Sequence, residues 1–173
     1  LKIPYSHSGV LASSLAMNKP VSKRAYERIG IPTAPDLLIS RREAAQKHPM
    51  SPPYVLKPVN EVSSVGIYII MEEGDSSRDK FAEEGHPDDE IMVEKFIPGR
   101  ELTCAVMGEK VLGVTEIIPA VGFYDYKAKY SDGGSKHIVP AEIPAQLWEQ
   151  VSDYALKAHK ILGCKGVSRS DFR

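Results

Sequence analysis

The sequence predicts an α+β protein built in two successive parts. In residues 19–96, segments whose apolar residues have helical spacing alternate with strand-like apolar runs, in the order α-β-α-β-loop-β-α-β. From residue 101 onward the pattern changes, because two apolar runs flank the turn residues Gly108-Glu109-Lys110. Strands joined by such a short turn pair antiparallel, so the second part should contain an antiparallel sheet.

Three segments follow from this change of pattern. Residues 1–18 are rich in Ser, Gly and Ala and are expected to be a linker with a short helix. Residues 19–97 are expected to form a small α/β subdomain, and residues 98–173 a partial second domain. The chain starts at Leu1 rather than Met and stops inside the strand-like run 166–173. We therefore expect a fragment of a longer protein.

The first helix of the α/β subdomain has clear local signals. Asn18 is expected to cap it, because a side-chain oxygen there satisfies the first amides of a helix. Val21, Ala25 and Ile29 recur every fourth residue and form one apolar face. Gly30 ends the helix.

The other elements are predicted from apolar runs bounded by Gly, Pro and polar residues. In the first part, strands are expected at 37–39, 54–57, 66–70 and 91–96, with helices near 41–48 and within the acidic stretch 72–90. In the second part, strands are expected at 101–107, 111–118 and 166–173, a long loop at 119–140, and a helix opened by Pro144 with a buried stripe of Leu147, Val151, Ala155, Ala158 and Leu162.

The composition excludes several classes of protein. The 173 residues carry a net charge of −1 with 42% apolar content, as in an ordinary soluble globular protein. No positive excess points to nucleic acid, and no apolar stretch approaches the ~20 residues of a membrane span, so neither partner is expected. Cys104 and Cys164 have no metal-binding spacing and are expected to be buried thiols of a reducing cytoplasm.

A first candidate site follows the strand that ends near Lys57. The next residues include Ser63, Ser64 and Gly66, whose small side chains expose backbone amides and add hydroxyl donors. Such a turn can cradle phosphate oxygens while the lysine supplies charge. No helix follows, so this is not a Walker loop, and taken alone the signal favours a plain β-hairpin over a phosphate-binding turn.

A second candidate is the extended segment that starts at Glu94-Lys95. Neighbouring residues on a strand point to opposite faces, so these two are not simply a surface pair. Next to Pro98-Gly99, the segment is suited to an interdomain hinge whose backbone pairs with an adenine edge, with Glu101 accepting ribose hydroxyls. A routine strand end is an equal alternative.

Arg169 and Asp171 form a third candidate. Residues two apart on a strand share a face, so a cation and a carboxylate lie side by side. The Asp suits Mg²⁺ and the Arg suits developing negative charge, whereas a structural ion pair is the alternative. A loop at 123–130, with three tyrosines and two lysines, is suited to closing over a site, or is a surface loop held by its aromatic side chains.

The order of these signals resembles the D-alanine–D-alanine ligase family of ATP-grasp enzymes across nearly the whole chain. The resemblance implies an ATP-grasp fold with a small α/β subdomain and a partial antiparallel-sheet catalytic domain. It also implies that residues 1–18 are a linker from a missing N-terminal domain. FYDYKAKY and EVSSVG distinguish this family from generic ATP-grasp proteins such as biotin carboxylases. The similar runs are MNK, YVLKP, EVSSVG, VEKFIPGREL, GFYDYKAKY and LGCKGVSRSDFR.

The resemblance also implies roles for individual residues. Lys19 and Lys57 would bind the phosphates of ATP, and Ser63 and Ser64 would lie on the loop that covers them. Glu94, Lys95 and Ile97 would line the adenine pocket. Glu101 would bind the ribose. Lys129 would meet the transferred phosphate, Tyr130 with Ser63 would lock the substrate loop, Arg169 would stabilise the oxyanion of the tetrahedral intermediate, and Asp171 would bind Mg²⁺ or Mn²⁺.

The implied reaction is ATP-dependent joining of two D-alanines through an acyl phosphate, for peptidoglycan precursors, by a cytoplasmic homodimer. Alternatives are another ATP-grasp ligase, such as a D-alanine–D-lactate ligase, or a non-catalytic nucleotide-binding fragment. Val62 departs from the family's EGSSVG, where Gly is usual. The family's N-terminal glutamate and its Glu and Asn ligands for Mg²⁺ are absent from this sequence, which leaves Asp171 as a lone and poor metal ligand.

Overall fold

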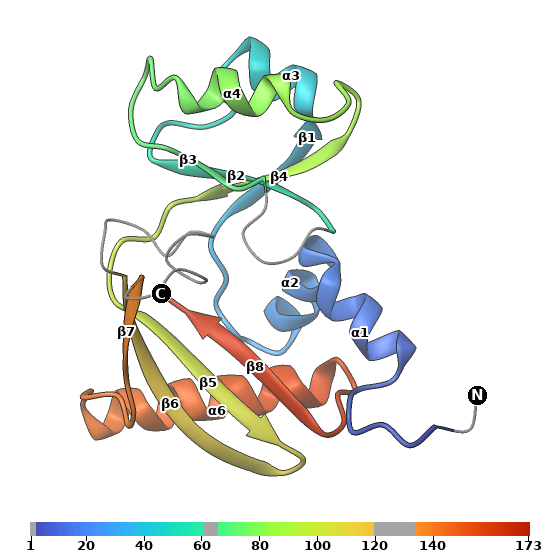
Figure 1. The fold of residues 1–173 in the computed structure, drawn as a ribbon, viewed down its shortest axis with the longest axis vertical. Coiled ribbons are helices and arrows are strands. Elements are labelled where there is room, and N and C mark those ends of the chain that lie inside the picture. Colours follow the sequence, from blue (N-terminus) through green and yellow to red (C-terminus); the bar gives the residue numbers. More distant parts are fainter. Residues whose placement is uncertain (1–2, 61–65, 120–133) are drawn as a thin grey trace. The chain divides into compact units, whose positions relative to one another are not determined.

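The computed structural model describes residues 3–60, 66–119 and 134–173 and confirms the α+β class (Figure 1). The chain forms two compact units. The first unit contains residues 1–16, 21–31 and 98–173, and the second unit contains residues 17–20 and 32–97. These units divide the chain differently from the three expected segments, because most of the first two helices is grouped with residues 98–173.

The second unit is a four-stranded antiparallel sheet in the order β1-β4-β2-β3. Helices α3 and α4 cover one face of this sheet (Figure 1). Strand residues Tyr54, Leu56, Ile91 and Val93 pack there against Ala44 and Phe81 of the helices. The bounds are β1 Asp36–Ser40, α3 Arg41–Gln46, β2 Tyr54–Pro58, β3 Tyr68–Ile70, α4 Ser77–Glu83 and β4 Glu90–Lys95.

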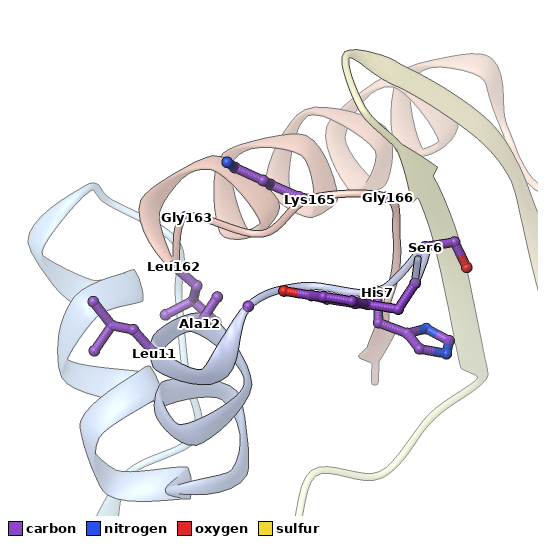
Figure 2. A pocket seen from close by; sticks show the side chains of 10 residues that line it. Ser6, His7, Leu11, Ala12, Leu162, Gly163, Lys165 and Gly166 are labelled. Atoms are coloured by element: carbon purple, nitrogen blue, oxygen red, sulfur yellow. The ribbon is translucent and has the colours of Figure 1, made fainter. Parts of the chain in front are cut away.

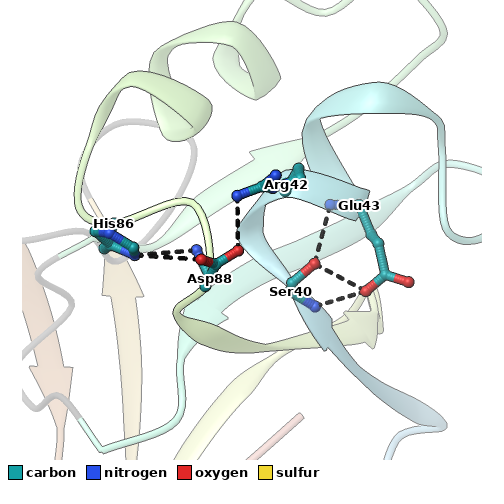
Figure 3. Close-up of polar contacts among 5 residues, drawn as sticks. All are labelled: Ser40, Arg42, Glu43, His86 and Asp88. Atoms are coloured by element: carbon teal, nitrogen blue, oxygen red, sulfur yellow. Dashed lines mark hydrogen bonds and ion pairs between the residues drawn. The ribbon is translucent and has the colours of Figure 1, made fainter.

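A capping box turns β1 directly into α3 (Figure 3). The Ser40 amide donates to Glu43 Oε2 at 2.9 Å, and the Glu43 amide donates to Ser40 Oγ at 3.2 Å. These hydrogen bonds satisfy amides that the first helical turn leaves without partners, and they lower the pKa of the Glu43 carboxyl. Arg42 Nη2 lies 2.8 Å from Asp88 Oδ1 in the loop before β4.

The first unit holds a second antiparallel sheet, in the order β7-β6-β5-β8, with α6 packed against one face (Figure 1). Leu102, Cys104 and Val106 of β5 contact Val151 and Ala155 of α6 in its core. The bounds in and beside this unit are α1 Val10–Met17, α2 Lys19–Arg28, β5 Glu101–Met107, β6 Lys110–Pro119, β7 Ser135–Ile138, α6 Ala145–Ile161 and β8 Val167–Phe172.

Three sequence expectations are corrected here. Strand β7 lies in the stretch 119–140 that was expected to be a loop, because the pairing of Ser135–Ile138 with the end of β6 overrides a weak local pattern. Leu147 is 36% exposed and does not complete the buried stripe of α6, which starts one turn later. Cys104 is buried as expected, but Cys164 is only partly buried; both are free thiols.

The N-terminal segment is fastened to the loop after α6. Ser8 Oγ donates to the Lys165 carbonyl at 3.0 Å and accepts the Lys165 amide at 3.1 Å. Gly166 makes this approach possible, since a Cβ built there would lie 1.8 Å from the Ser6 carbonyl oxygen. None of the described helices is both long enough and apolar enough to cross a membrane.

Replacing Gly166 by Ala should destabilise the protein more than replacing Gly163 by Ala. Both glycines adopt left-handed backbone, with φ of 68° and 69°, so each Ala meets the same conformational cost of about 1–2 kcal/mol. Only Gly166→Ala adds a clash with the backbone, because nothing lies within 4 Å of a Cβ at Gly163. Thermal unfolding midpoints of the two variants should differ, and equal midpoints would show that the close approach is absent.

Candidate functional site

In the second unit, charged residues occupy the sheet face opposite α3 and α4. The register places Val55 opposite Glu94 and Lys57 opposite Met92, so Lys57 and Glu94 are diagonal neighbours on one face. Their side chains form an ion pair, and each is only 17% exposed. The structure therefore brings together two residues that the sequence assigned to ATP. The next residue along β4, Lys95, is exposed.

Lys19 lies against the end of β2. Its Nζ donates to the carbonyl oxygens of Pro58 at 3.0 Å and Val59 at 3.4 Å, and its amide donates to Val59 O at 3.3 Å. Lys57 belongs to the same strand end. Lys19 and Lys57, the two cations expected to bind phosphate, therefore both lie at the end of β2. The expected phosphate loop begins shortly afterwards in the sequence, at residue 61. Ser63, Ser64 and the unusual Val62 lie outside the described residues.

At the end of β4 and just after it, the backbone amides are partly engaged in hydrogen bonds within the second unit. The Lys95 amide donates to Pro35 O at 2.9 Å, and the Phe96 amide donates to Pro53 O at 3.2 Å. Within the described parts of the chain, the Ile97 amide has no hydrogen-bond partner. An extended segment with an available amide is the arrangement that pairs with the edge of a planar base.

In the first unit, the sheet face opposite α6 carries Arg169 and Asp171. Arg169 Nε lies 3.0 Å from Asp171 Oδ1, and Arg169 Nη2 donates to Oδ2 at 3.2 Å, which makes a two-pronged contact. Thr103 of β5 lies directly opposite Asp171 in the register and donates its hydroxyl to Oδ1 at 2.8 Å. Arg169 and Asp171 side chains remain 56% and 50% exposed, so both are accessible to a ligand.

Glu101 opens β5 and is only 16% exposed, with Oε2 lying 3.9 Å from Arg173 Nη2. The preceding Arg100 donates from Nε and Nη2 to the two carboxylate oxygens of Glu116, each at 2.5 Å. This hydrogen bonding lowers the pKa of Glu116 and raises that of Arg100. Sequence reasoning missed Arg100, Glu116 and Thr103; the long-range pairing that reveals them has no local sequence signal.

Asp171 is the described residue that the sequence assigned to Mg²⁺. No group of three His, Cys, Asp or Glu side chains in these parts of the chain could hold a metal ion. Asp171 supplies a single carboxylate, held in place by Thr103 and Arg169. Mg²⁺ in nucleotide enzymes is bound through one or two carboxylates together with substrate phosphates, so Asp171 fits such a site only with a nucleotide present.

A pocket of about 420 Å³ lies elsewhere in the first unit, and none of the expected site residues lines it. Figure 2 shows Ser6 and His7 of the N-terminal segment beside the turn from Leu162 to Gly166. The expected substrate-loop residues Lys129 and Tyr130 lie outside the described residues.

A protein-family model described as "D-ala D-ala ligase C-terminus" matches residues 26–173. The chain belongs to this family. Its relatives include the D-alanine--D-alanine ligases of Parvibaculum lavamentivorans, 53% identical over 175 residues, and of Chelativorans sp., 54% identical over 178 residues. Both alignments cover 100% of this chain but only 56% and 57% of the relatives, so the chain spans just over half of their length.

Solved ligase structures share the family's fold and confirm the ATP-grasp expectation. The VanG D-Ala:D-Ser ligase of Enterococcus faecalis is 34% identical with a TM-score of 0.79, over 98% of this chain and 51% of that one. The D-alanine--D-alanine ligase of Bacillus anthracis complexed with ATP is 31% identical with a TM-score of 0.71, over 98% of this chain and 55% of that one.

The ion pair at Glu116 predicts a specific pH dependence of stability. Arg100 lowers the pKa of Glu116 in the folded state below its usual 4.5. The ion pair therefore contributes its full stabilisation at pH values above 4.5. The contribution is lost as the pH falls through the lowered pKa. Glu116→Gln should therefore lower the thermal unfolding midpoint at pH 7, and this difference from wild type should shrink as the pH falls toward 3.

Asp153→Asn serves as the control for this measurement. Asp153 pairs with Lys157 at an exposed (i, i+4) position, where an ion pair contributes little. Its midpoint should stay near that of wild type throughout. A Glu116→Gln difference that is constant with pH would contradict the assignment of this pH dependence to the carboxyl.

Proposed function

We propose that the full-length protein containing this chain is an ATP-dependent D-alanine–D-alanine ligase that supplies peptidoglycan precursors. The observation that carries the proposal is the identity of more than half of all residues, along the entire chain, with relatives of that name. The charged sheet faces described above add support, because they present cations and carboxylates suited to a nucleotide and its phosphates.

The residues that the family resemblance assigns to ATP would each bind a different part of the nucleotide. Lys19 and Lys57 would neutralise the phosphates, with Ser63 and Ser64 covering them from the loop. Glu94, Lys95 and Ile97 would line the adenine pocket, with the Ile97 amide donating to the base, and Glu101 would accept the ribose hydroxyls. The existing Lys57–Glu94 ion pair already restricts both side chains, so less rotamer entropy is lost when the nucleotide binds.

In the first step of the reaction, two anions must meet: the carboxylate of one D-alanine and the triphosphate of ATP. The carboxylate of the first D-alanine attacks the γ-phosphorus of ATP, and the bond to the departing ADP breaks. Lys19, Lys57 and Lys129 would lower the repulsion between carboxylate and triphosphate, which is strong where water is excluded. Tyr130 and Ser63 would hold the substrate loop closed over the site.

In the second step, the amine of the second D-alanine attacks the acyl phosphate and inorganic phosphate leaves. Arg169 would donate to the oxyanion of the tetrahedral intermediate. The geometry permits this, because Asp171 engages only the Nε and Nη2 groups of a guanidinium with five N–H donors.

Asp171 would bind Mg²⁺, or Mn²⁺, jointly with the ATP phosphates, and the ion would neutralise phosphate charge. Thr103 and Arg169 would keep the carboxylate oriented toward it. We further propose that the full-length protein is a cytoplasmic homodimer.

The second substrate has one alternative that an observation favours. The VanG neighbour is a D-Ala:D-Ser ligase by name, so a different second substrate is compatible with this fold. The higher identity to D-alanine--D-alanine ligases favours D-alanine as the second substrate, over D-serine and over the D-lactate of related ligases.

ADP release measured with D-alanine should separate a ligase from a non-catalytic nucleotide-binding module. We expect full-length protein to release ADP and form dipeptide, and the isolated 173-residue chain to do neither. D-serine or D-lactate added with limiting D-alanine should not displace dipeptide as the main product. Dipeptide formation by the isolated chain would contradict our assignment of one metal carboxylate to it.

Arg169→Ala in the full-length protein should lower kcat by about 10²–10³, the usual effect of removing one oxyanion donor. Arg24→Ala is a matched control, since Arg24 is also 56% exposed and also pairs with a carboxylate, that of Glu27. That control should retain wild-type kcat. Wild-type turnover by Arg169→Ala would remove Arg169 from the mechanism.

A further inference from the structure

The segment that leads into β5 is held by an unusually close set of contacts. Arg100 forms the two 2.5 Å hydrogen bonds to Glu116 of β6 and a third, from Nη2, to the Glu142 carbonyl at 2.9 Å. Glu116 is only 9% exposed, whereas Arg100 is 48% exposed. A planar guanidinium with two parallel bonds to a carboxylate fixes orientation as well as distance.

A second arginine holds the preceding residue from another direction. Arg173, just after β8, donates from Nη1 to the Gly99 carbonyl at 3.1 Å. Gly99 has a φ of 130°, a backbone conformation that favours glycine. Residue 100 is therefore anchored to β6, and residue 99 to the residue that follows β8.

These contacts determine where Glu101 points. The register pairs Glu116 with Leu102, which packs in the α6 core, so Arg100 is drawn to that side of the sheet. Because neighbouring residues on a strand alternate, Glu101 is directed to the opposite face. Thr103 lies two residues further on that same face, next to Asp171.

We propose that Arg100, held by Glu116, is a positioning residue that keeps the Glu101 carboxylate directed at the ribose of bound ATP. The inference rests on the proposed function, because it takes Glu101 as the ribose ligand. It adds that ribose recognition depends on a side chain that itself points away from the nucleotide. Arg100 is thus distinct from the residues expected to touch ATP.

The test compares ATP with 2′-deoxy-ATP and 3′-deoxy-ATP on the full-length protein. Dissociation constants are measured by calorimetry without D-alanine, and KM for ATP and kcat are measured with it. Arg100→Lys keeps the positive charge but loses the planar guanidinium that makes two parallel hydrogen bonds to Glu116. We expect it to weaken ATP binding roughly tenfold, the scale of one hydrogen bond to a charged group. Binding of the deoxynucleotide that lacks the hydroxyl contacted by Glu101 should change little. The ratio of its dissociation constant to that of ATP should therefore fall, while kcat stays close to wild type.

Two further variants make the result specific. Glu116→Gln should reproduce the loss of discrimination with Arg100 intact, and Arg100→Lys added to Glu101→Gln should cause no further loss. Arg42→Lys is the control for the chemical change, because Arg42 also pairs with a carboxylate, that of Asp88 in the second unit, and should keep wild-type discrimination.

The outcomes separate the two proposals. If wild type binds ATP and discriminates against a deoxynucleotide but Arg100→Lys discriminates equally well, the positioning role is wrong and the proposed function stands. If wild type neither binds ATP nor releases ADP with D-alanine, the proposed function itself fails. A loss in Arg100→Lys that persists fully in the Glu101→Gln background would also overturn the inference, because Arg100 would then act independently of Glu101.

Discussion

The structure depends on one geometric constraint, the alternation of side chains along a strand. In the second unit, Leu56 and Val93 face the core beneath α3 and α4, so Lys57 and Glu94 must face the other way. In the first unit, Cys104 packs toward α6, and Thr103 beside it therefore faces Asp171. A register shift of one residue would move every one of these charges into a core.

Charges with little solvent exposure, on either side of the sheets, remain compatible with folding where they are paired with opposite charges. Lys57 and Glu94 are each 17% exposed and form an ion pair, and the more deeply buried Glu116 accepts two bonds from Arg100. Removing one partner of a buried pair leaves an uncompensated charge, which costs more than the pair itself contributes. The same pairing holds ligand-binding groups in place before any substrate arrives.

Local patterns predicted much of the fold but little of the packing around the site. The helix and strand order of residues 19–96 appears as expected. Arg169 and Asp171 share a face, also as expected, because they lie two positions apart, which is one period of a strand. Strand β7 was missed, because its four residues become a strand only by pairing with β6. Thr103 was missed for a similar reason, since it lies 68 positions from its partner Asp171.

The sequence alone determined the fold class, the order of elements within residues 19–96 and the family, because turn residues, apolar periods and motif runs are local properties of the chain. Only the tertiary structure decided which charges meet. Strand register placed Lys57 diagonally to Glu94, and joined Arg100 to Glu116 across 16 positions. Pairing between distant strands is selected by burial of whole sheet faces, a sum over many residues, and so no single motif encodes it.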